Sequence, residues 1–145
     1  NEHDFHQGPS AGMRAPNIML SANNITQPAS LHDLYRGTHY ALMLFSGATN
    51  SPNMDTLLEI GTTIQSQYQA SIKPYIITLD LPANEEDNEH FIIDADKNIH
   101  ELYAAWQPCL YLIRPDKYIA YRSQIINQDQ LTTYLDRILI RKAIN

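Results

Sequence analysis

Residues 108–122 read Pro-Cys-Leu-Tyr-Leu-Ile-Arg-Pro-Asp-Lys-Tyr-Ile-Ala-Tyr-Arg, and this stretch predicts a β-hairpin. Residues 110–113 form an unbroken apolar run, which is typical of a strand buried on both faces. Pro115 and Asp116 favour a tight turn, because proline presets one corner and the aspartate side chain can bond its own backbone. The return over residues 118–122 is rich in strand-forming residues. We therefore expect the other elements to be arranged against this hairpin.

Buried strands and helices alternate in the chain before the hairpin. Residues 39–46 give the clearest central strand, and an amphipathic helix follows from about Asn53. Residues 72–80 give a second buried strand, and residues 91–94 a short third one. Buried strands joined through a helix indicate a parallel crossover unit.

The first part of the chain contributes less regular elements. Residues 12–20 are expected to form an extended first strand, because proline constrains Ala15 and because Ile18 and Leu20 share one face. Ser30 and Gly37 then frame a short helix.

Two helices flank the hairpin. Residues 98–103 predict a short helix with Ile99, Leu102 and Tyr103 facing inward. Asn127 can cap the last helix, and one apolar face of that helix comprises Leu131, Tyr134, Leu135, Ile138 and Leu139. We expect this face to pack on the sheet beside the hairpin.

The order of elements is strand, short helix, strand, long helix, strand, short helix, hairpin and helix. It predicts an α/β protein with a mixed central sheet and helices on both faces, which is the thioredoxin-like three-layer fold. We assign residues 1–11 to a flexible N-terminal arm and residues 12–145 to the thioredoxin-like domain.

The residue counts and the net charge narrow the classes of possible binding partner. The chain has 145 residues, ten basic and sixteen acidic, with a net charge of −6. This acidic balance argues against non-specific binding of nucleic acid or of an anionic membrane, and no apolar run reaches membrane-spanning length. A single cysteine and no visible signal peptide fit a cytoplasmic protein. The chain begins at Asn1 without an initiator methionine, so we expect a segment of a longer protein or a processed product.

A redox-active thioredoxin relative carries its reactive cysteine in the loop after the central strand, where a helix N-terminus lowers the thiol pKa. Here residues 46–53 read Ser-Gly-Ala-Thr-Asn-Ser-Pro-Asn, without cysteine. Hydroxyl groups do not form disulfides, so thiol–disulfide exchange is excluded at that place. The lone Cys109 follows Pro108, at the position where thioredoxin-like proteins have a cis-proline. It is either a thiol near the former active-site groove or, as we prefer, a small buried residue opening a core strand.

The remaining candidate groups have simpler explanations. Asp94 and Asp96 fit a helix cap and its neighbour better than a pair of acid–base groups. His3, Asp4 and His6 could imitate a metal ligand set, but they lie on a loose terminus where nothing orients them. The acidic cluster of Glu85, Glu86, Asp87 and Glu89 has no ligand pattern, and the scattered histidines have no partner at ligand spacing; these histidines are His32, His39, His90 and His100. We therefore assign no catalytic, cofactor-binding or metal-binding residue.

Four segments, in the same order, resemble motifs of flavin-dependent aromatic-ring hydroxylases of the phenol hydroxylase and phenylpropionate hydroxylase type. Residues 12–17 resemble their Gly-x-Arg-x-Pro-His segment, and residues 31–45 their Leu-x-Asp-Leu…Gly…Phe-x-Leu-Leu pattern. Residues 94–103 are similar to Asp-x-Asp-Gly…Tyr. Residues 111–122 resemble the hairpin Leu-Val-Arg-Pro-Asp-Gly-x-Val-Ala-Trp-Arg, which is the most specific motif. The turn glycine of that motif is Lys117 here, and a left-handed lysine costs on the order of 1 kcal/mol.

This resemblance implies an accessory role. In such hydroxylases the corresponding region is a C-terminal thioredoxin-like domain without redox cysteines, which contributes packing and, in some members, subunit contacts. FAD, NAD(P)H and the aromatic substrate would belong to preceding FAD-binding and substrate domains of the parent chain, and a homo-oligomer is possible. The alternative is a free-standing degenerate thioredoxin- or peroxiredoxin-like protein that uses Cys109 alone.

Overall fold

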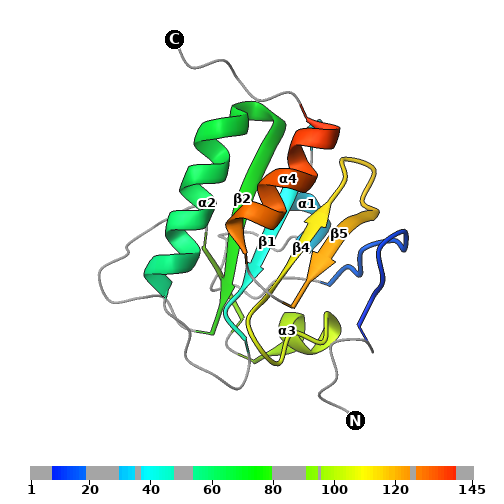
Figure 1. Ribbon diagram of the computed structural model, residues 1–145. Coiled ribbons are helices and arrows are strands. Elements are labelled where there is room, and N and C mark those ends of the chain that lie inside the picture. Colours follow the sequence, from blue (N-terminus) through cyan, green and yellow to red (C-terminus); the bar gives the residue numbers. More distant parts are fainter. Residues whose placement is uncertain are drawn as a thin grey trace.

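The computed structural model describes residues 8–18, 30–34, 37–47, 54–79, 91–94, 96–124 and 127–139. Its centre is a five-stranded sheet in the order β3-β2-β1-β4-β5 (Figure 1). In chain order the strands are β1 (Tyr40–Phe45), β2 (Ile72–Thr78), β3 (Phe91–Ile93), β4 (Cys109–Ile113) and β5 (Ile119–Ser123). The described helices include none that is both long and apolar enough to cross a bilayer.

The sheet is mixed, as the order of elements predicted. β1 pairs in parallel with β2, and β2 in parallel with β3. On its other side β1 pairs antiparallel with β4, which pairs antiparallel with β5. The central position of β1 and the burial of all five residues of β4 confirm what their apolar runs indicated.

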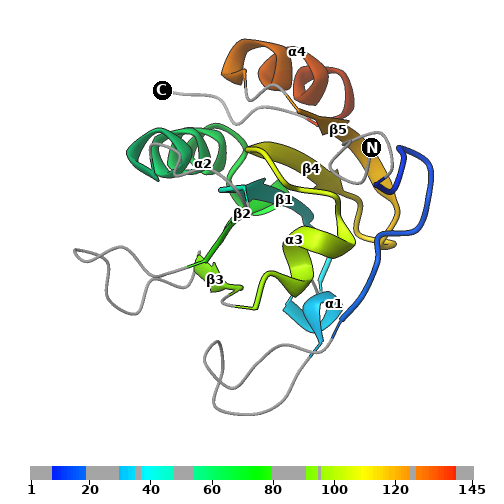
Figure 2. The ribbon, with the colours of Figure 1, turned by 90° about the horizontal axis from the view of Figure 1, so that it is seen from below.

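Helices cover both faces of the sheet (Figure 2). One face carries α2 (Met54–Tyr68), which continues into the short 3₁₀ turn Gln69–Ser71, and α4 (Gln128–Ile138). The other face carries α1 (Leu31–Leu34) and α3 (Asn98–Leu102). This three-layer arrangement confirms the predicted α/β thioredoxin-like architecture.

Each layer has its own apolar core, because successive residues of a strand point to opposite faces. The core under α2 and α4 includes Leu42, Leu44, Leu57, Ile60, Ile64, Ile76, Leu112, Leu131 and Leu135. The core under α1 and α3 includes Leu31, Met43, Phe45, Ile77, Ile99, Tyr103, Cys109 and Tyr111.

The hairpin forms as its sequence predicts. The Lys117 amide donates to the Arg114 carbonyl at 2.8 Å, which closes a tight turn around Pro115 and Asp116. An Asp116 carboxylate oxygen accepts a hydrogen bond from the Tyr118 amide at 3.2 Å. Lys117 has φ 74, so the left-handed conformation anticipated for this lysine is present.

The last helix packs beside the hairpin, also as predicted. The Asn127 side chain accepts a hydrogen bond from the Gln130 amide at 2.9 Å and so caps α4. The Tyr134 hydroxyl donates to the Ala120 carbonyl of β5 at 2.9 Å. The Tyr68 hydroxyl of α2 donates to Asp136 at 2.6 Å, which joins the two helices of this layer.

Three details differ from the predictions. Residues 12–18 form no strand; they form an isolated bridge between Arg14 and Tyr118, just before β5, and exchange backbone hydrogen bonds with Ile119. In α3, Leu102 is 38% exposed, and the buried position is taken by His100. Ile138, at the end of α4, is also 38% exposed. Residues 1–7 lie outside the described part of the chain, so the boundary of the N-terminal arm stays a prediction.

Candidate functional site

The candidate site lies at the end of β1, where a redox-active thioredoxin relative would begin its cysteine-bearing loop. Ser46 and Gly47 leave this strand, and residues 48–53 lie outside the described part of the chain. Gly47 has φ 92, and a Cβ there would come within 2.9 Å of the Gln107–Pro108 peptide. A glycine is therefore needed for the chain to pass so close to the start of β4.

Cys109 opens β4 directly opposite Phe45 of β1. Its side chain is fully buried, and this burial raises the pKa of the thiol well above its ordinary value, despite the opposing effect of the Arg122 charge. A nucleophilic cysteine needs access and thiolate character, and Cys109 has neither. The interpretation of Cys109 as a small core residue is confirmed. No cis peptide bond occurs in the described residues, so the peptide before Pro108 is trans.

A buried polar cluster lies beside this cysteine. Asp94 follows β3, and its carboxylate accepts hydrogen bonds from the backbone amides of Ile99 and His100 at 3.0 and 2.8 Å. The His100 Nδ1 atom lies 2.7 Å from the same carboxylate, and its Nε2 atom lies 3.4 Å from the Ser46 hydroxyl. The cluster therefore joins the ends of β1 and β3 to the first turn of α3.

Two opposing effects, burial and hydrogen bonding, decide the charge state of Asp94 in this cluster. Burial alone would raise the pKa of Asp94, but the hydrogen bonds from the His100 ring and from the two backbone amides outweigh it and lower that pKa. Asp94 is therefore an anion at neutral pH. The His100 ring also packs edge-on against Phe45 at a centroid distance of 5.3 Å.

The order Ser46–His100–Asp94 is that of a nucleophile, a base and an orienting acid. However, the exposed fractions of these residues are 3%, 0% and 5%. A substrate cannot reach the Ser46 hydroxyl in this arrangement, so the cluster acts as an internal tie between elements. Sequence reasoning identified Asp94 as a cap and found no partner for His100 at ligand spacing, but it did not foresee the hydrogen bond between these two side chains. The available signal was an acid that ends one element six residues before a histidine in the first turn of the next.

The other candidate residues are dispersed. His32 donates from Nε2 to the Ala15 carbonyl at 2.8 Å, and its pKa is lowered mainly by burial. His39 precedes β1, and its pKa is also lowered, first by burial and then by the Lys73 and Lys117 charges. Asp96 is exposed. The remaining groups fall outside the described residues: His3, Asp4, His6, Glu85, Glu86, Asp87, Glu89 and His90. Among the described residues, no three His, Cys, Asp or Glu side chains are placed to hold a metal ion.

The hairpin residues that carry the hydroxylase resemblance have structural contacts in this fold. Arg122 lies over the ring of buried Tyr111 at 5.6 Å from its centroid. Tyr121, on the opposite face of the strand, stacks on Tyr134 of α4 at 4.7 Å. The motif thus ties β5 to both layers of the molecule.

The sequence matches no protein-family model and none of the curated proteins with which it was compared. Solved structures do match. A putative thiol:disulfide interchange protein from Chlorobium tepidum has a TM-score of 0.67 and 16% identity, over 88% of this chain and 96% of that one. The mitochondrial 2-Cys peroxiredoxin from Plasmodium falciparum has a TM-score of 0.63 and 17% identity, over 89% of this chain and 94% of that one.

A third similar structure is larger. Aklavinone-11 hydroxylase, solved with FAD and aklavinone, has a TM-score of 0.60 and 19% identity to this chain. The match covers 87% of this chain but 20% of the hydroxylase. These likenesses, together with the strand order and the helices on both faces, show that the chain has a thioredoxin-like fold.

Proposed function

We propose that this chain is an accessory, redox-inactive thioredoxin-like domain of an FAD-dependent aromatic-ring monooxygenase. The observation that carries the proposal is that the chain lacks a reactive thiol. The stretch after β1 has no cysteine, and the only thiol, Cys109, is buried with a raised pKa. The scaffold therefore lacks the nucleophile on which thiol–disulfide exchange depends.

The link to a monooxygenase rests on two independent likenesses. The hairpin and the three earlier motifs resemble those of aromatic-ring hydroxylases and occur in the same order. A similar fold occupies 20% of aklavinone-11 hydroxylase, the size expected of one domain within a longer chain. In the proposed arrangement FAD, NAD(P)H and substrate bind to preceding domains of the parent chain, and this domain contributes packing or subunit contacts.

The redox part of the proposal is tested by alkylation. Native protein is treated with iodoacetamide at mildly alkaline pH, and the modified fraction is measured by mass spectrometry. We expect Cys109 to react only after denaturation. A variant with an exposed cysteine, Asp96→Cys, provides the matched control and reacts at that added site in the native state. Rapid modification of Cys109 in the native protein would overturn this part of the proposal.

The parent protein is tested separately, by the coding sequence upstream of Asn1. A monooxygenase requires an FAD-binding segment there, with a Gly-x-Gly-x-x-Gly turn after a strand. A stop codon shortly before Asn1 would contradict the assignment to a longer flavoprotein.

A second candidate is a free-standing degenerate thioredoxin- or peroxiredoxin-like protein. It is favoured by the extent of the matches to such proteins, which cover 94% and 96% of their chains. It requires Cys109 to become accessible, because this is the only thiol in the chain. Peroxide consumption that disappears in the Cys109→Ser variant would support this candidate over the accessory role.

A further inference from the structure

A groove of about 360 Å³ lies between β5 and α4, on the side of the molecule away from Cys109. Its lining consists of Tyr121, Asp129, Gln130, Thr133, Tyr134 and Arg137. The groove is shallow and open to solvent, and its volume lies at the lower end of the range of roughly 300–1,000 Å³ that small-molecule sites occupy. Neither the strand order nor the buried polar cluster accounts for this groove.

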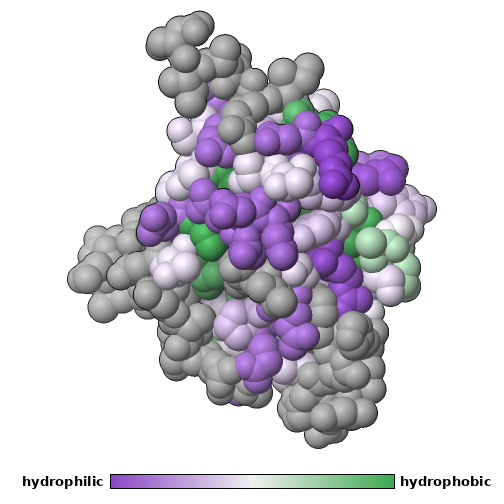
Figure 3. Space-filling model, in the orientation of Figure 1, coloured by the Kyte–Doolittle hydropathy of each residue, from purple (hydrophilic) through white to green (hydrophobic). Residues whose placement is uncertain are grey.

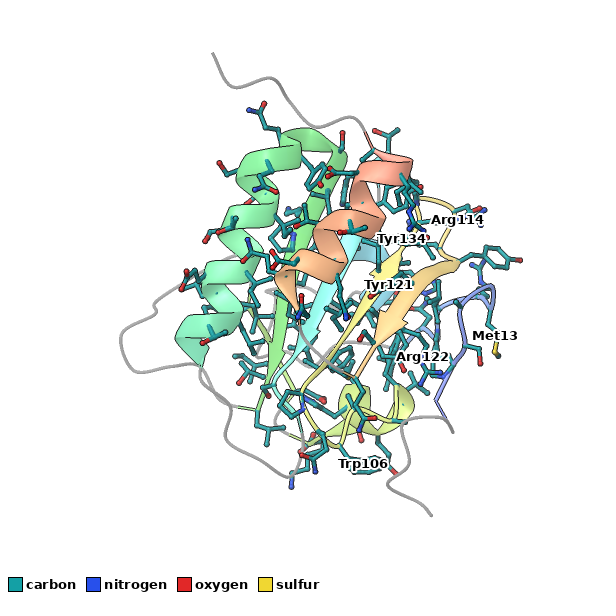
Figure 4. The ribbon with its side chains drawn as sticks, viewed as in Figure 1. Met13, Trp106, Arg114, Tyr121, Arg122 and Tyr134 are labelled. Atoms are coloured by element: carbon teal, nitrogen blue, oxygen red, sulfur yellow. The ribbon has the colours of Figure 1, made fainter. Side chains whose placement is uncertain are left out.

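Two aromatic rings form its apolar surface. Tyr121 and Tyr134 stack with their centroids 4.7 Å apart and their planes 29° from parallel, and both side chains lie between β5 and α4 (Figure 4). The Tyr134 hydroxyl is held by the Ala120 carbonyl at 2.9 Å. This hydrogen bond orients the Tyr134 ring on which Tyr121 stacks, so the pair presents an aromatic surface to a planar molecule.

Opposite charges mark the two ends of the groove. Asp129 lies in the first turn of α4 and Arg137 in its last turn. Eight helical positions separate them by about 12 Å along the axis. Within the described part of the chain, no side chain forms an ion pair with either residue. The face of the molecule that carries α2 and α4 is largely hydrophilic (Figure 3).

The helix dipole explains an acid at the start of α4 and a base at its end. It does not explain why both project beside the same stacked tyrosines. We propose that this groove binds a small aromatic acid. Its carboxylate pairs with Arg137, its ring stacks on the tyrosine pair, and a hydroxyl at the far end donates to Asp129.

The proposal is tested with three small probes on isotopically labelled protein. 4-Hydroxybenzoate has the ring, the carboxylate and the hydroxyl; 4-hydroxybenzamide lacks the charge; cyclohexanecarboxylate lacks the aromatic face. We expect 4-hydroxybenzoate to cause saturable amide shifts at Tyr121, Thr133 and Arg137, and to bind more tightly than either control. Absence of saturation up to about 20 mM, or shifts centred elsewhere, would overturn the site.

Arg137→Gln is the variant that isolates the carboxylate contact. We expect it to weaken 4-hydroxybenzoate about fivefold, as for an exposed ion pair, and to leave 4-hydroxybenzamide unchanged. Arg14→Gln removes the same charge from the exposed segment beside the hairpin turn and should leave both affinities unchanged. If both variants lose the same affinity for 4-hydroxybenzoate, the effect comes from general charge attraction, and the proposed contact between Arg137 and the carboxylate is refuted.

Discussion

At the scale of single residues, two lysines hold backbone conformations that glycine adopts more easily. Lys117 has φ 74 in the hairpin turn, and Lys97 has φ 64 just before α3. Both occupy positions where the resembling hydroxylase motifs have glycine. A Cβ in the left-handed region costs roughly 1–2 kcal/mol, so each position stores strain that the surrounding hydrogen bonds must offset.

Lys117→Gly is therefore expected to stabilise the fold. Relief of the left-handed strain exceeds the additional unfolded-state entropy of glycine, and we expect a net gain of about 0.5–1 kcal/mol in the free energy of unfolding. Urea denaturation followed by circular dichroism measures it. Lys117→Ala removes the same side chain but keeps a Cβ, so it should give no gain. If both variants gain the same stability, the effect comes from removing the lysine side chain and not from relief of backbone strain.

The buried carboxylate of Asp94 predicts a dependence of stability on pH. Its folded-state pKa is lowered, so the folded protein binds fewer protons than the unfolded chain around the unfolded pKa of about 3.9. The stability that Asp94 contributes is thus present above this pH and is lost as pH falls through the folded pKa.

Asp94→Asn should remove this dependence. We expect it to cost about 2–3 kcal/mol at neutral pH, because the variant breaks a buried pair that also caps α3. The difference in urea midpoint between wild type and variant should shrink from about pH 6 to pH 2. Asp96→Asn changes an exposed carboxyl two residues away and should have little effect. A difference that is constant with pH would show that Asp94 carries no stabilising charge in the fold.

His100 shows why residue-level prediction was incomplete. Periodicity placed Leu102 inside because it is apolar, whereas the fold exposes Leu102 and buries His100. The burial is possible only because Asp94, on another element, accepts the Nδ1 hydrogen bond at 2.7 Å. The pattern of apolar residues within a short helix does not reveal whether another element supplies a hydrogen-bond partner, and such a partner is what allows a polar side chain to be buried.

At the scale of elements, α4 has the clearest local signals. Its N-cap Asn127 and the apolar positions Leu131 and Leu135 were predicted from the sequence and occur in the structure, although Ile138 at the end of the predicted apolar face is exposed. The segment before α1 lacked such agreement. Gly12 adopts φ 91, and Pro16 has no N–H to donate. The contact with β5 is therefore confined to a few hydrogen bonds around Arg14, instead of a full strand.

Asn127→Ala should destabilise α4. The side chain accepts the Gln130 amide hydrogen bond, and its loss leaves that amide without an intrahelical acceptor. We expect the free energy of unfolding to fall by about 1 kcal/mol. Asn127→Asp restores an oxygen acceptor at the cap and should recover most of the stability. Failure of the aspartate to rescue would show that Asn127 acts through something other than the cap.

At the scale of the whole molecule, β1 joins the two layers. Leu42 and Leu44 face α2 and α4, while Ala41, Met43 and Phe45 face α1 and α3. The sheet could be predicted because a strand buried on both faces reads as an apolar run. The internal tie was only partly predictable, because the Asp94 cap was visible in the sequence whereas Ser46 lies 54 residues from His100. The groove was not predictable, because β5 and α4 are consecutive elements and only their packing brings Tyr121 onto Tyr134.

A shared central strand predicts that the two layers unfold together. Leu44 is fully buried beneath α2, where a Cβ at Gly61 would lie 3.5 Å from its Cδ1 atom. Leu44→Ala should cost about 3 kcal/mol through lost burial and a residual cavity. The single tryptophan, Trp106, lies beside α3 at the far side of the sheet and reports on the other layer (Figure 4).

We expect Leu44→Ala to lower the urea midpoint of Trp106 fluorescence and the midpoint of far-ultraviolet circular dichroism by the same amount. The reason is that disruption of β1 from one face removes the strand on which the other core is built. Met13→Ala, at a side chain that is 52% exposed, should move neither midpoint. If the dichroism midpoint falls while that of Trp106 stays in place, the α1/α3 layer is stable without the α2/α4 layer, and β1 does not couple them.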